Sequence, residues 1–304
     1  MTGIDRRKQQ IPKSREGWTS MQSDFLAKVH TMYNQFTKAE KKVADFILQN
    51  PKRVLFMSIT ELADECKVGD TSVFRFCRTM GVKGYQEFKM QLSLSIHDGK
   101  EEESRLAGET SLEDSFSELA KKVLNTNMKA LAETYSLLDE KVVSQTVDIL
   151  HAAERIWFFG VGASLLVALK AANKFLRIEP KVYCVQDTHT QAMIAATMRP
   201  GEAAVVFSYS GATKDSIHVA ELAKHAGAKV ICITHFAKSP LTAFADLVLL
   251  CGSEEGPLQG GSASAEIGQL FLVDLLCTEY YRRYYDACSK NNEKTSQSVL
   301  DKLY

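Results

Sequence analysis

The stretch "EAAVVFSYSGATKDSIHVAELAKHAG", residues 202–227, joins an apolar run, a short hydroxyl-rich loop and a helix-compatible segment. An uninterrupted apolar run is typical of a strand that is covered on both faces, as in a parallel sheet. The loop places Ser208, Ser210 and Thr213 around Gly211, directly before the expected helix. Because helix N-termini favour anions, this stretch predicts an α/β sheet with an anion site after one strand.

Similar apolar runs occur on both sides of this stretch, and helix-compatible sequence separates them. They cover residues 155–160, 181–185, 229–234 and 246–250. This alternation predicts a doubly wound parallel sheet of about five strands. We expect this α/β domain to span residues 116–288, with a C-terminal tail over residues 289–304.

A second loop that carries Gly and Ser, "GVGAS" at residues 160–164, follows the first expected strand. Ligands of doubly wound sheets bind at the carboxyl ends of the strands, where the two loops should meet. Leu165 stands where a dinucleotide fingerprint needs its third glycine, and the hydroxyl loop has no lysine before Lys214, so neither that fingerprint nor a P-loop is present. The alternative is that these residues are only turn formers and caps. The expected phosphate ligands are Ser164, Ser208, Ser210, Gly211 and Thr213.

The N-terminal third has helical periodicity instead of apolar runs. Thr37 and Glu40 have the spacing of a capping box at the start of one helix. Two shorter helices follow, the first with Thr60 as its expected cap, and the turn "KVGD" at 67–70 separates them. This arrangement predicts a helix-turn-helix. The alternative is an ordinary three-helix bundle, which has such turns as well and whose exposed arginines only face solvent. On its second helix, the core-facing side chains should be Val73, Phe76 and Cys77, and the DNA-facing ones Thr71, Ser72, Arg75 and Arg78, with Lys83 after it.

The charge distribution supports DNA binding by the N-terminal part of the chain, and the composition indicates an intracellular protein. Residues 1–100 hold 17 Lys and Arg against 11 Asp and Glu, although the whole chain has zero net charge. No apolar run approaches the roughly 20 residues of a membrane span, and the N-terminus lacks the apolar centre of a secretory signal. The seven scattered cysteines contain no C-x-x-C pair, so we expect reduced thiols in the cytoplasm, with no metal, no cofactor and no membrane partner. Residues 1–20 should be a disordered tail, and residues 99–115 a linker.

The residues of the N-terminal third add a family resemblance. The segments "MSITELA", "VFRFCR" and "GVKGYQEFK" closely resemble the helix-turn-helix domain of RpiR-type transcriptional regulators, over residues 21–98. The family often has Ser at the N-cap of the recognition helix, where this chain has Gly69. We expect Asp70 to take over the capping role.

The C-terminal part is similar to the sugar isomerase (SIS) domain, which binds phosphosugars. The matching segments are "GVGAS", "SYSGATKDS" and "DTHTQ". The resemblance implies that Ser208, Ser210 and Thr213 hold the phosphate with Ser164, and that His189 contacts the sugar. The segment around residues 262–268 also contributes in that family, and Glu266 stands where a basic residue is common.

Together, the two resemblances imply a transcriptional regulator of sugar or aminosugar metabolism genes, without enzymatic activity. Its partners would be double-stranded operator DNA and a phosphosugar effector, and it would act as a homodimer or homotetramer. The expected surfaces for this association are the apolar helices at 116–150 and the last helix of the domain, which carries Tyr280, Tyr281, Tyr284 and Tyr285. The alternative is a phosphosugar isomerase or lyase with an accessory helical domain, since Glu266, His189 and His235 could serve as general bases.

Overall fold

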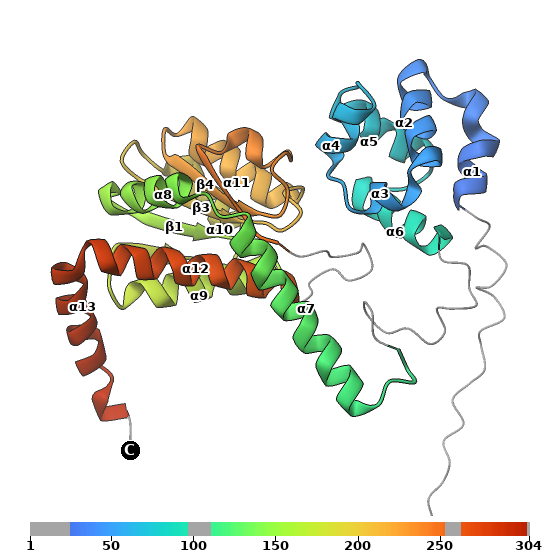
Figure 1. Cartoon of the computed structure of the whole chain (residues 1–304). Helices are drawn as coiled ribbons and strands as arrows, with labels where there is room; N and C mark the ends of the chain where they lie inside the picture. Colours follow the sequence, from blue (N-terminus) through green and yellow to red (C-terminus); the bar gives the residue numbers. More distant parts are fainter. Residues whose placement is uncertain (1–24, 97–110, 253–262, 303–304) are drawn as a thin grey trace, which may run out of the picture.

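The computed structural model describes residues 25–96, 111–252 and 263–302. Six α-helices and a 3₁₀ turn form the N-terminal bundle, which lies beside the sheet (Figure 1). Its elements are α1 (Phe25–Met32), η1 (Tyr33–Gln35), α2 (Lys38–Gln49), α3 (Pro51–Leu55), α4 (Ile59–Glu65), α5 (Asp70–Thr79) and α6 (Tyr85–Ile96). Phe76 and Phe88 meet at its centre with their ring centroids 5.6 Å apart. The helical class expected for this part is confirmed.

Two helices of the bundle begin with a capping box. Thr37 caps α2 and pairs with Glu40, as expected. Ser58 caps α4 and pairs with Glu61, so Thr60 lies inside the helix. Because the Ser58 side chain and the Glu61 carboxylate together satisfy two backbone amides at the helix start, the expectation that Thr60 is the cap is wrong.

The C-terminal part alternates helices and strands. Its elements are α7 (Phe116–Ser136), α8 (Glu140–Ala152), β1 (Ile156–Phe159), α9 (Ala163–Leu176), β2 (Val182–Cys184), α10 (Thr188–Thr197), β3 (Ala203–Phe207), α11 (Lys214–His225), β4 (Lys229–Thr234), η2 (Thr242–Phe244), β5 (Leu247–Leu250), α12 (Ala263–Arg283), α13 (Tyr285–Gln297) and η3 (Leu300–Lys302). The sheet has five parallel strands in the order β2-β1-β3-β4-β5. The doubly wound sheet predicted from the sequence is confirmed.

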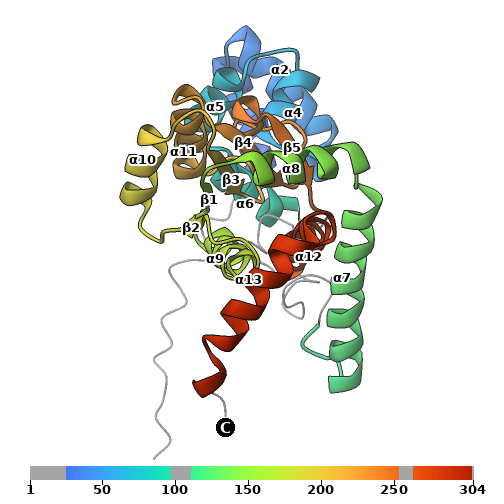
Figure 2. The same cartoon turned by 90° about the vertical axis from the view of Figure 1, so that its left-hand side faces the viewer.

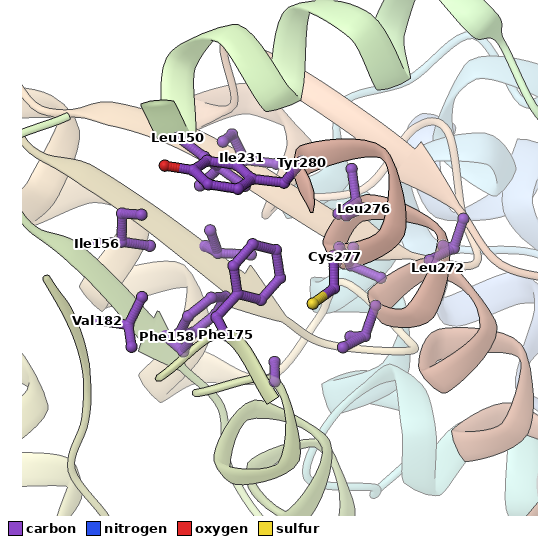
Figure 3. Close-up of a cluster of buried hydrophobic side chains, with 14 of the residues drawn as sticks. Leu150, Ile156, Phe158, Phe175, Val182, Ile231, Leu272, Leu276, Cys277 and Tyr280 are labelled. Atoms are coloured by element: carbon purple, nitrogen blue, oxygen red, sulfur yellow. The ribbon is translucent and has the colours of Figure 1, made fainter. Parts of the chain in front are cut away.

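Helices cover both faces of this sheet, and successive strand residues point to opposite faces. Phe158 packs in a cluster with residues of α8, α9 and α12, and Figure 3 shows this layer around Phe158, Phe175 and Tyr280. Its neighbour Phe159 packs in a second cluster with residues of α10 and α11. Apolar side chains are therefore needed at consecutive strand positions, which is the continuous pattern of the sequence.

The last two helices differ from the sequence expectation in one respect. Tyr280 on α12 is only 1% exposed and belongs to the sheet core. α13 carries Cys288, also buried, and Asn291 Nδ2 donates to the carbonyl oxygen of Ile178 at 3.0 Å. The expected boundary at residue 288 therefore falls inside a helix that packs on the sheet domain.

The long helix α7 extends well beyond the sheet in both views (Figures 1 and 2).

None of the helices in the three described ranges has both the length and the apolar character that a membrane crossing requires. The tail expected over residues 1–20 lies outside the described residues, as does most of the expected linker.

Candidate functional site

The loop between β3 and α11 forms a tight turn lined by hydroxyl groups. Ser208 follows β3 directly, is 2% exposed, and its amide donates to the carbonyl oxygen of Ile233 on β4 at 3.1 Å. The Ser208 hydroxyl donates to Thr213 Oγ1 at 3.4 Å, across the turn. The Gly211 amide donates to the Ser208 carbonyl oxygen at 3.2 Å, and the Ala212 amide to Ser210 Oγ at 3.2 Å. Hydrogen bonds across the turn therefore hold the hydroxyls of Ser208, Ser210 and Thr213 close together in space.

Gly211 is required at the centre of this turn. Its φ is +59°, in the left-handed region that favours glycine. A Cβ atom on Gly211 would lie 2.1 Å from Ser239 Oγ and 2.6 Å from Ser239 Cβ. The Leu241 amide donates to the Gly211 carbonyl oxygen at 3.0 Å. The loop backbone therefore packs directly against the segment that follows β4.

The N-terminus of α11 begins immediately after this loop. Thr213 is the N-cap residue, and its side chain makes no capping hydrogen bond. The amides of the first turn are therefore left open by the cap, and the helix dipole gives this end a partial positive charge. Ser216, in the same first turn, is 3% exposed and its hydroxyl has no hydrogen-bond partner among the described residues. The sequence analysis did not single out this buried hydroxyl.

The loop after β1 lies at the same edge of the sheet. Phe159 of β1 pairs with Val206 of β3, so both loops leave adjacent parallel strands in the same direction. A Cβ atom on Gly160 would lie 2.6 Å from the Ser164 carbonyl oxygen, which explains why this position is glycine. Gly162 caps α9 with a φ of +60°, and Ser164 is half-buried in the first turn of the helix. The parallel register thus brings together the two loops that the sequence analysis paired.

The two expected sugar contacts lie further out. His189 is exposed in the first turn of α10, which follows β2, the strand beside β1. Glu266 is half-buried in the first turn of α12. Two residues later, a Cβ atom on Gly268 would lie 2.9 Å from the Gly252 carbonyl oxygen, just beyond the end of β5. Both residues therefore lie near the carboxyl edge of the sheet, and their contact with a ligand stays a prediction.

Gln191 supports the loop after β1 through its side chain, a role that the sequence analysis did not predict. Its side chain is 1% exposed, and Nε2 donates to the carbonyl oxygens of Gly160 and Val185, each at 3.0 Å. These two bonds hold the loop after β1 against α10. The only signal for Gln191 in the sequence was its position in "DTHTQ", the segment that predicted His189 as a sugar contact.

The second candidate site is the helix-turn-helix of α4 and α5. Lys67 in the turn between them has a φ of +52°, and the Val68 amide donates to the Ala63 carbonyl oxygen at 2.9 Å. Gly69 is the N-cap of α5 and provides no side-chain hydrogen bond. Asp70 accepts a 2.8 Å hydrogen bond from Thr60 on α4, so it joins the two helices instead of capping α5. The expectation that Asp70 replaces the missing cap is wrong.

The faces of α5 follow the predicted pattern. The expected core residues Val73, Phe76 and Cys77 are fully buried. The expected DNA-facing residues Thr71, Arg75 and Arg78 are exposed, Ser72 is half-buried, and Lys83 is exposed in the turn after the helix. Phe74 is 41% exposed on the same helix, an apolar side chain that the sequence analysis did not place. α5 therefore presents hydroxyl, guanidinium and aromatic groups to the outside.

Among the described residues, neither region gathers the side chains of a metal centre. Within the three described ranges, no group of three or more His, Cys, Asp or Glu side chains could hold a metal ion. The seven cysteines are free thiols, and six of them are buried. Burial raises the pKa of Cys77 to about 12 and that of Cys66 to about 11. These thiols are protonated core residues at neutral pH.

Comparison with known proteins matches both parts of the chain. A model for the helix-turn-helix domain of the rpiR family matches residues 23–99, and a model for the SIS domain matches residues 149–279. An uncharacterized HTH-type transcriptional regulator from Haemophilus influenzae is 36% identical over 277 residues, which cover 91% of this chain and 96% of that protein. The HTH-type transcriptional regulator HexR from Pseudomonas aeruginosa is 36% identical over 255 residues, which cover 84% of this chain and 88% of that protein.

A solved structure extends the similarity to the whole architecture. The NanR protein of Vibrio vulnificus, complexed with ManNAc-6P, superposes with a TM-score of 0.81 at 30% identity and covers 92% of this chain and 99% of that one. The two relatives from Haemophilus influenzae and Pseudomonas aeruginosa are both named as HTH-type transcriptional regulators, and each covers more than four fifths of this chain. The chain therefore belongs to the RpiR family of DNA-binding transcriptional regulators, and it is a regulator, not the phosphosugar isomerase or lyase that the sequence alone left open.

Proposed function

We propose that this protein regulates genes of sugar or aminosugar metabolism and that a phosphosugar bound at the loop after β3 controls its DNA binding. The observation that carries the proposal is the hydroxyl-lined turn at the open N-terminus of α11, on a chain that also holds a helix-turn-helix. The complex of NanR with ManNAc-6P supports a sugar phosphate as the class of effector. The proposal takes residues 21–98 as the DNA-binding domain, and it takes as the effector domain the part of the chain from residue 116 to the end of α13.

The phosphate would be held by neutral donors and a helix dipole. The hydroxyls of Ser208, Ser210 and Thr213 lie around the start of α11, and Ser164 lies in the first turn of α9, directly after the neighbouring loop. A phosphate dianion at this position would exchange the internal hydrogen bonds of the loop for charge-assisted ones, which are about twice as strong. It would also gain from the partial positive charge of the helix end.

The sugar would face His189 and Glu266. A carboxylate accepts hydrogen bonds from sugar hydroxyls and pairs with a protonated amine. Glu266 therefore favours a sugar that carries an amine or many hydroxyls over one that carries a second acid group. Replacing Glu266 by Gln should lower the affinity for a phosphorylated amino sugar more than the affinity for its neutral hydroxyl analogue.

Calorimetric titration tests the phosphate site. Wild type, Ser208→Ala and Ser210→Ala should be titrated with glucose 6-phosphate, glucosamine 6-phosphate and N-acetylmannosamine 6-phosphate. Each substitution removes one hydrogen bond to a charged group, so affinity should fall by about ten- to a hundredfold. Ser298→Ala, at an exposed serine beyond α13, is the matched control and should bind like wild type. Equal binding by wild type and both loop variants would show that the phosphate is held elsewhere.

We propose that α5 reads DNA in the major groove. Short hydroxyl side chains at the start of a recognition helix and arginines further along it suit base edges. Arg75→Ala should weaken specific binding by about 1–3 kcal/mol if the guanidinium reads a base. Lys83→Ala should weaken all sequences equally and reduce the salt dependence, as expected for a phosphate contact. Unchanged affinity of an Arg75/Arg78 double variant for a selected duplex would contradict this placement.

We propose that the protein acts as a homodimer, or as a tetramer built from dimers. One recognition helix contacts few base pairs, and two-fold dimers that read paired half-sites solve this problem. α7 offers a surface for a second copy, since it runs beyond the sheet and exposes Phe116, Val123, Leu124, Met128 and Tyr135 (Figure 2). Tyr280, which the sequence suggested for this role, is buried and cannot serve.

Light scattering tests the assembly. Wild type should scatter as a dimer or larger at micromolar concentration, and Leu124→Glu together with Met128→Glu should shift it toward the monomer. A wild-type monomer with and without DNA would refute the proposal.

We also propose that the protein acts in the cytoplasm. Its cysteines are free thiols, and disulfides do not persist in that compartment.

A further inference from the structure

The segment after β4, residues 235–241, packs against the phosphate loop. The His235 amide donates to the Tyr209 carbonyl oxygen at 3.0 Å, and the Leu241 amide donates to that of Gly211, also at 3.0 Å. Ser239 fills the space where a Gly211 side chain would be, with its Oγ 2.1 Å from the Cβ position. The loop and this segment are therefore joined at several points, and little space remains between them.

Aromatic rings continue this contact away from the loop. Tyr209, which lies between the two loop serines, stacks on His235 with ring centroids 5.0 Å apart and an interplanar angle of 17°. Phe236 stands edge-on to Tyr209 at 6.4 Å and is only 7% exposed. A displacement of the Tyr209 backbone would therefore move Phe236 as well, because close-packed rings have no free volume to absorb it.

The other side of the same segment holds the DNA-binding domain. Ser58, the N-cap of α4, donates its hydroxyl to the Lys238 carbonyl oxygen at 2.6 Å. Lys238 Nζ pairs with Asp64 Oδ2 near the other end of α4, also at 2.6 Å. α4 lies on the side of the N-terminal bundle that faces the sheet (Figure 1). Both ends of α4, the first helix of the helix-turn-helix, therefore rest on this segment.

A buried amine completes the contact. Lys89 on α6 is 5% exposed, its Nζ donates to the Met57 carbonyl oxygen at 3.2 Å, and it lies 5.6 Å from the centroid of the Phe236 ring. A cation over an aromatic face is stabilised most when both are removed from water. α4 is in turn joined to the recognition helix by the Thr60–Asp70 hydrogen bond at 2.8 Å. A continuous set of contacts thus leads from the phosphate loop to the helix that would enter the groove.

We propose that residues 235–241 are the element through which occupancy of the phosphate loop changes DNA affinity. The two states would be the docked one, in which α4 and Lys89 rest on this segment as described above, and a released one, in which a ligand-shifted loop displaces Ser239 and Phe236. This inference rests on the proposed function, since it needs a ligand at the loop. A ligand can shift the equilibrium only by its differential affinity for the two states, so the effect should be of the usual allosteric size, about 5- to 150-fold in DNA affinity.

The test separates binding from coupling in the full-length protein. Two variants break the contact: Phe236→Ala removes the ring under Lys89, and Lys238→Glu places a carboxylate against Asp64. Lys238 is 65% exposed, so the second variant should fold even if the first does not. Lys170→Glu, at an exposed lysine on α9, is the matched charge-reversal control. Each protein is titrated by calorimetry with the same three sugar 6-phosphates, and its affinity for a duplex selected from a random library is measured with and without them.

Wild type and Lys170→Glu should bind a sugar phosphate and change their DNA affinity at least about fivefold in response. Phe236→Ala and Lys238→Glu should bind the same sugar phosphate within about threefold of wild type, but their DNA response should fall below about twofold. Adding Asp64→Lys to Lys238→Glu restores opposite charges and should restore the response, which would assign the loss to this ion pair.

Two failures are distinguishable. If wild type responds and both interface variants respond equally, the inference about residues 235–241 is wrong and the proposed function stands. If no sugar phosphate changes the DNA affinity of wild type, the proposed function is overturned and the inference with it.

Discussion

Replacing Gly211 by Ala perturbs the phosphate loop at the point where it has least room. The position has a φ of +59°, and the new Cβ would lie 2.1 Å from Ser239 Oγ and 2.6 Å from Ser239 Cβ. The left-handed backbone costs a non-glycine residue about 1–2 kcal/mol. Forcing an extra methyl into a packed contact costs about 1–3 kcal/mol more. The free energy of unfolding of the sheet domain should therefore fall by about 2–5 kcal/mol.

Urea denaturation measures this change in one domain. Trp157 lies on β1 and stacks on Tyr183 at 4.7 Å, so its emission in a Trp18→Phe background reports on the sheet domain alone. Gly162→Ala is the control: its φ is +60°, but nothing lies within 4 Å of its Cβ position. This control should show the cost of backbone strain without the cost of the collision.

A double-mutant cycle isolates the collision. Ser239→Gly removes both atoms that the new methyl would meet and leaves Thr234 Oγ1, 3.3 Å away, as the nearest neighbour. Gly211→Ala should cost about 1–3 kcal/mol less in the Ser239→Gly background than in wild type. If the cost is the same in both backgrounds, the two residues are not in the contact described, and the packing argument for the loop and residues 235–241 fails.

Three further predictions concern buried polar groups. Burial lowers the pKa of Lys89 to about 8, so between about pH 8 and 10.5 the unfolded chain holds one proton more than the folded chain. The free energy of unfolding should therefore rise with pH across that window in wild type, but not in Lys89→Met. Burial raises the pKa of Cys77 and Cys232 to about 12, so at pH 8 neither thiol should react with a chromogenic disulfide until urea unfolds the protein, and rapid reaction in the native state would contradict the described burial. Gln191→Leu removes the donor from the buried carbonyl of Gly160 and from the partly buried carbonyl of Val185, so it should lower the free energy of unfolding by about 2–4 kcal/mol. An unchanged urea midpoint would show that those hydrogen bonds are not made.

Elements with strong local patterns could be predicted from the sequence. The apolar run at 202–207 predicted β3 to within one residue at its start, because a strand covered on both faces needs apolar side chains at consecutive positions. The Thr37–Glu40 box marked the start of α2 because both of its hydrogen bonds lie within four residues. The inward face of α5 followed from helical spacing alone, since Val73, Phe76 and Cys77 occupy one stripe.

Two local features were not predicted correctly from the sequence pattern: which of two hydroxyl residues caps α4, and whether Tyr280 is buried. Ser58 and Thr60 both carry a hydroxyl, but only Ser58 has a glutamate, Glu61, three positions later, and this spacing decides which of them is the cap. Tyr280 has a polar tip and was placed at the surface. In the structure its hydroxyl hydrogen-bonds to Glu179 Oε2 at 2.5 Å while its ring packs against Phe175. A tyrosine with a partner for its hydroxyl can be buried, and the sequence does not show that partner.

The sequence by itself determined the two folds, the hydroxyl loop and the outward face of the recognition helix, because these depend on backbone hydrogen bonds and on side-chain periodicity over a few residues. Only the tertiary structure decided how the two sites are joined. Ser58 and Lys238 are 180 positions apart, and no local pattern relates them. Gly211 was predicted as a phosphate ligand, and only the structure shows that Ser239 occupies the space beside it. Such contacts arise when whole elements pack, and packing depends on every side chain in the layer at once.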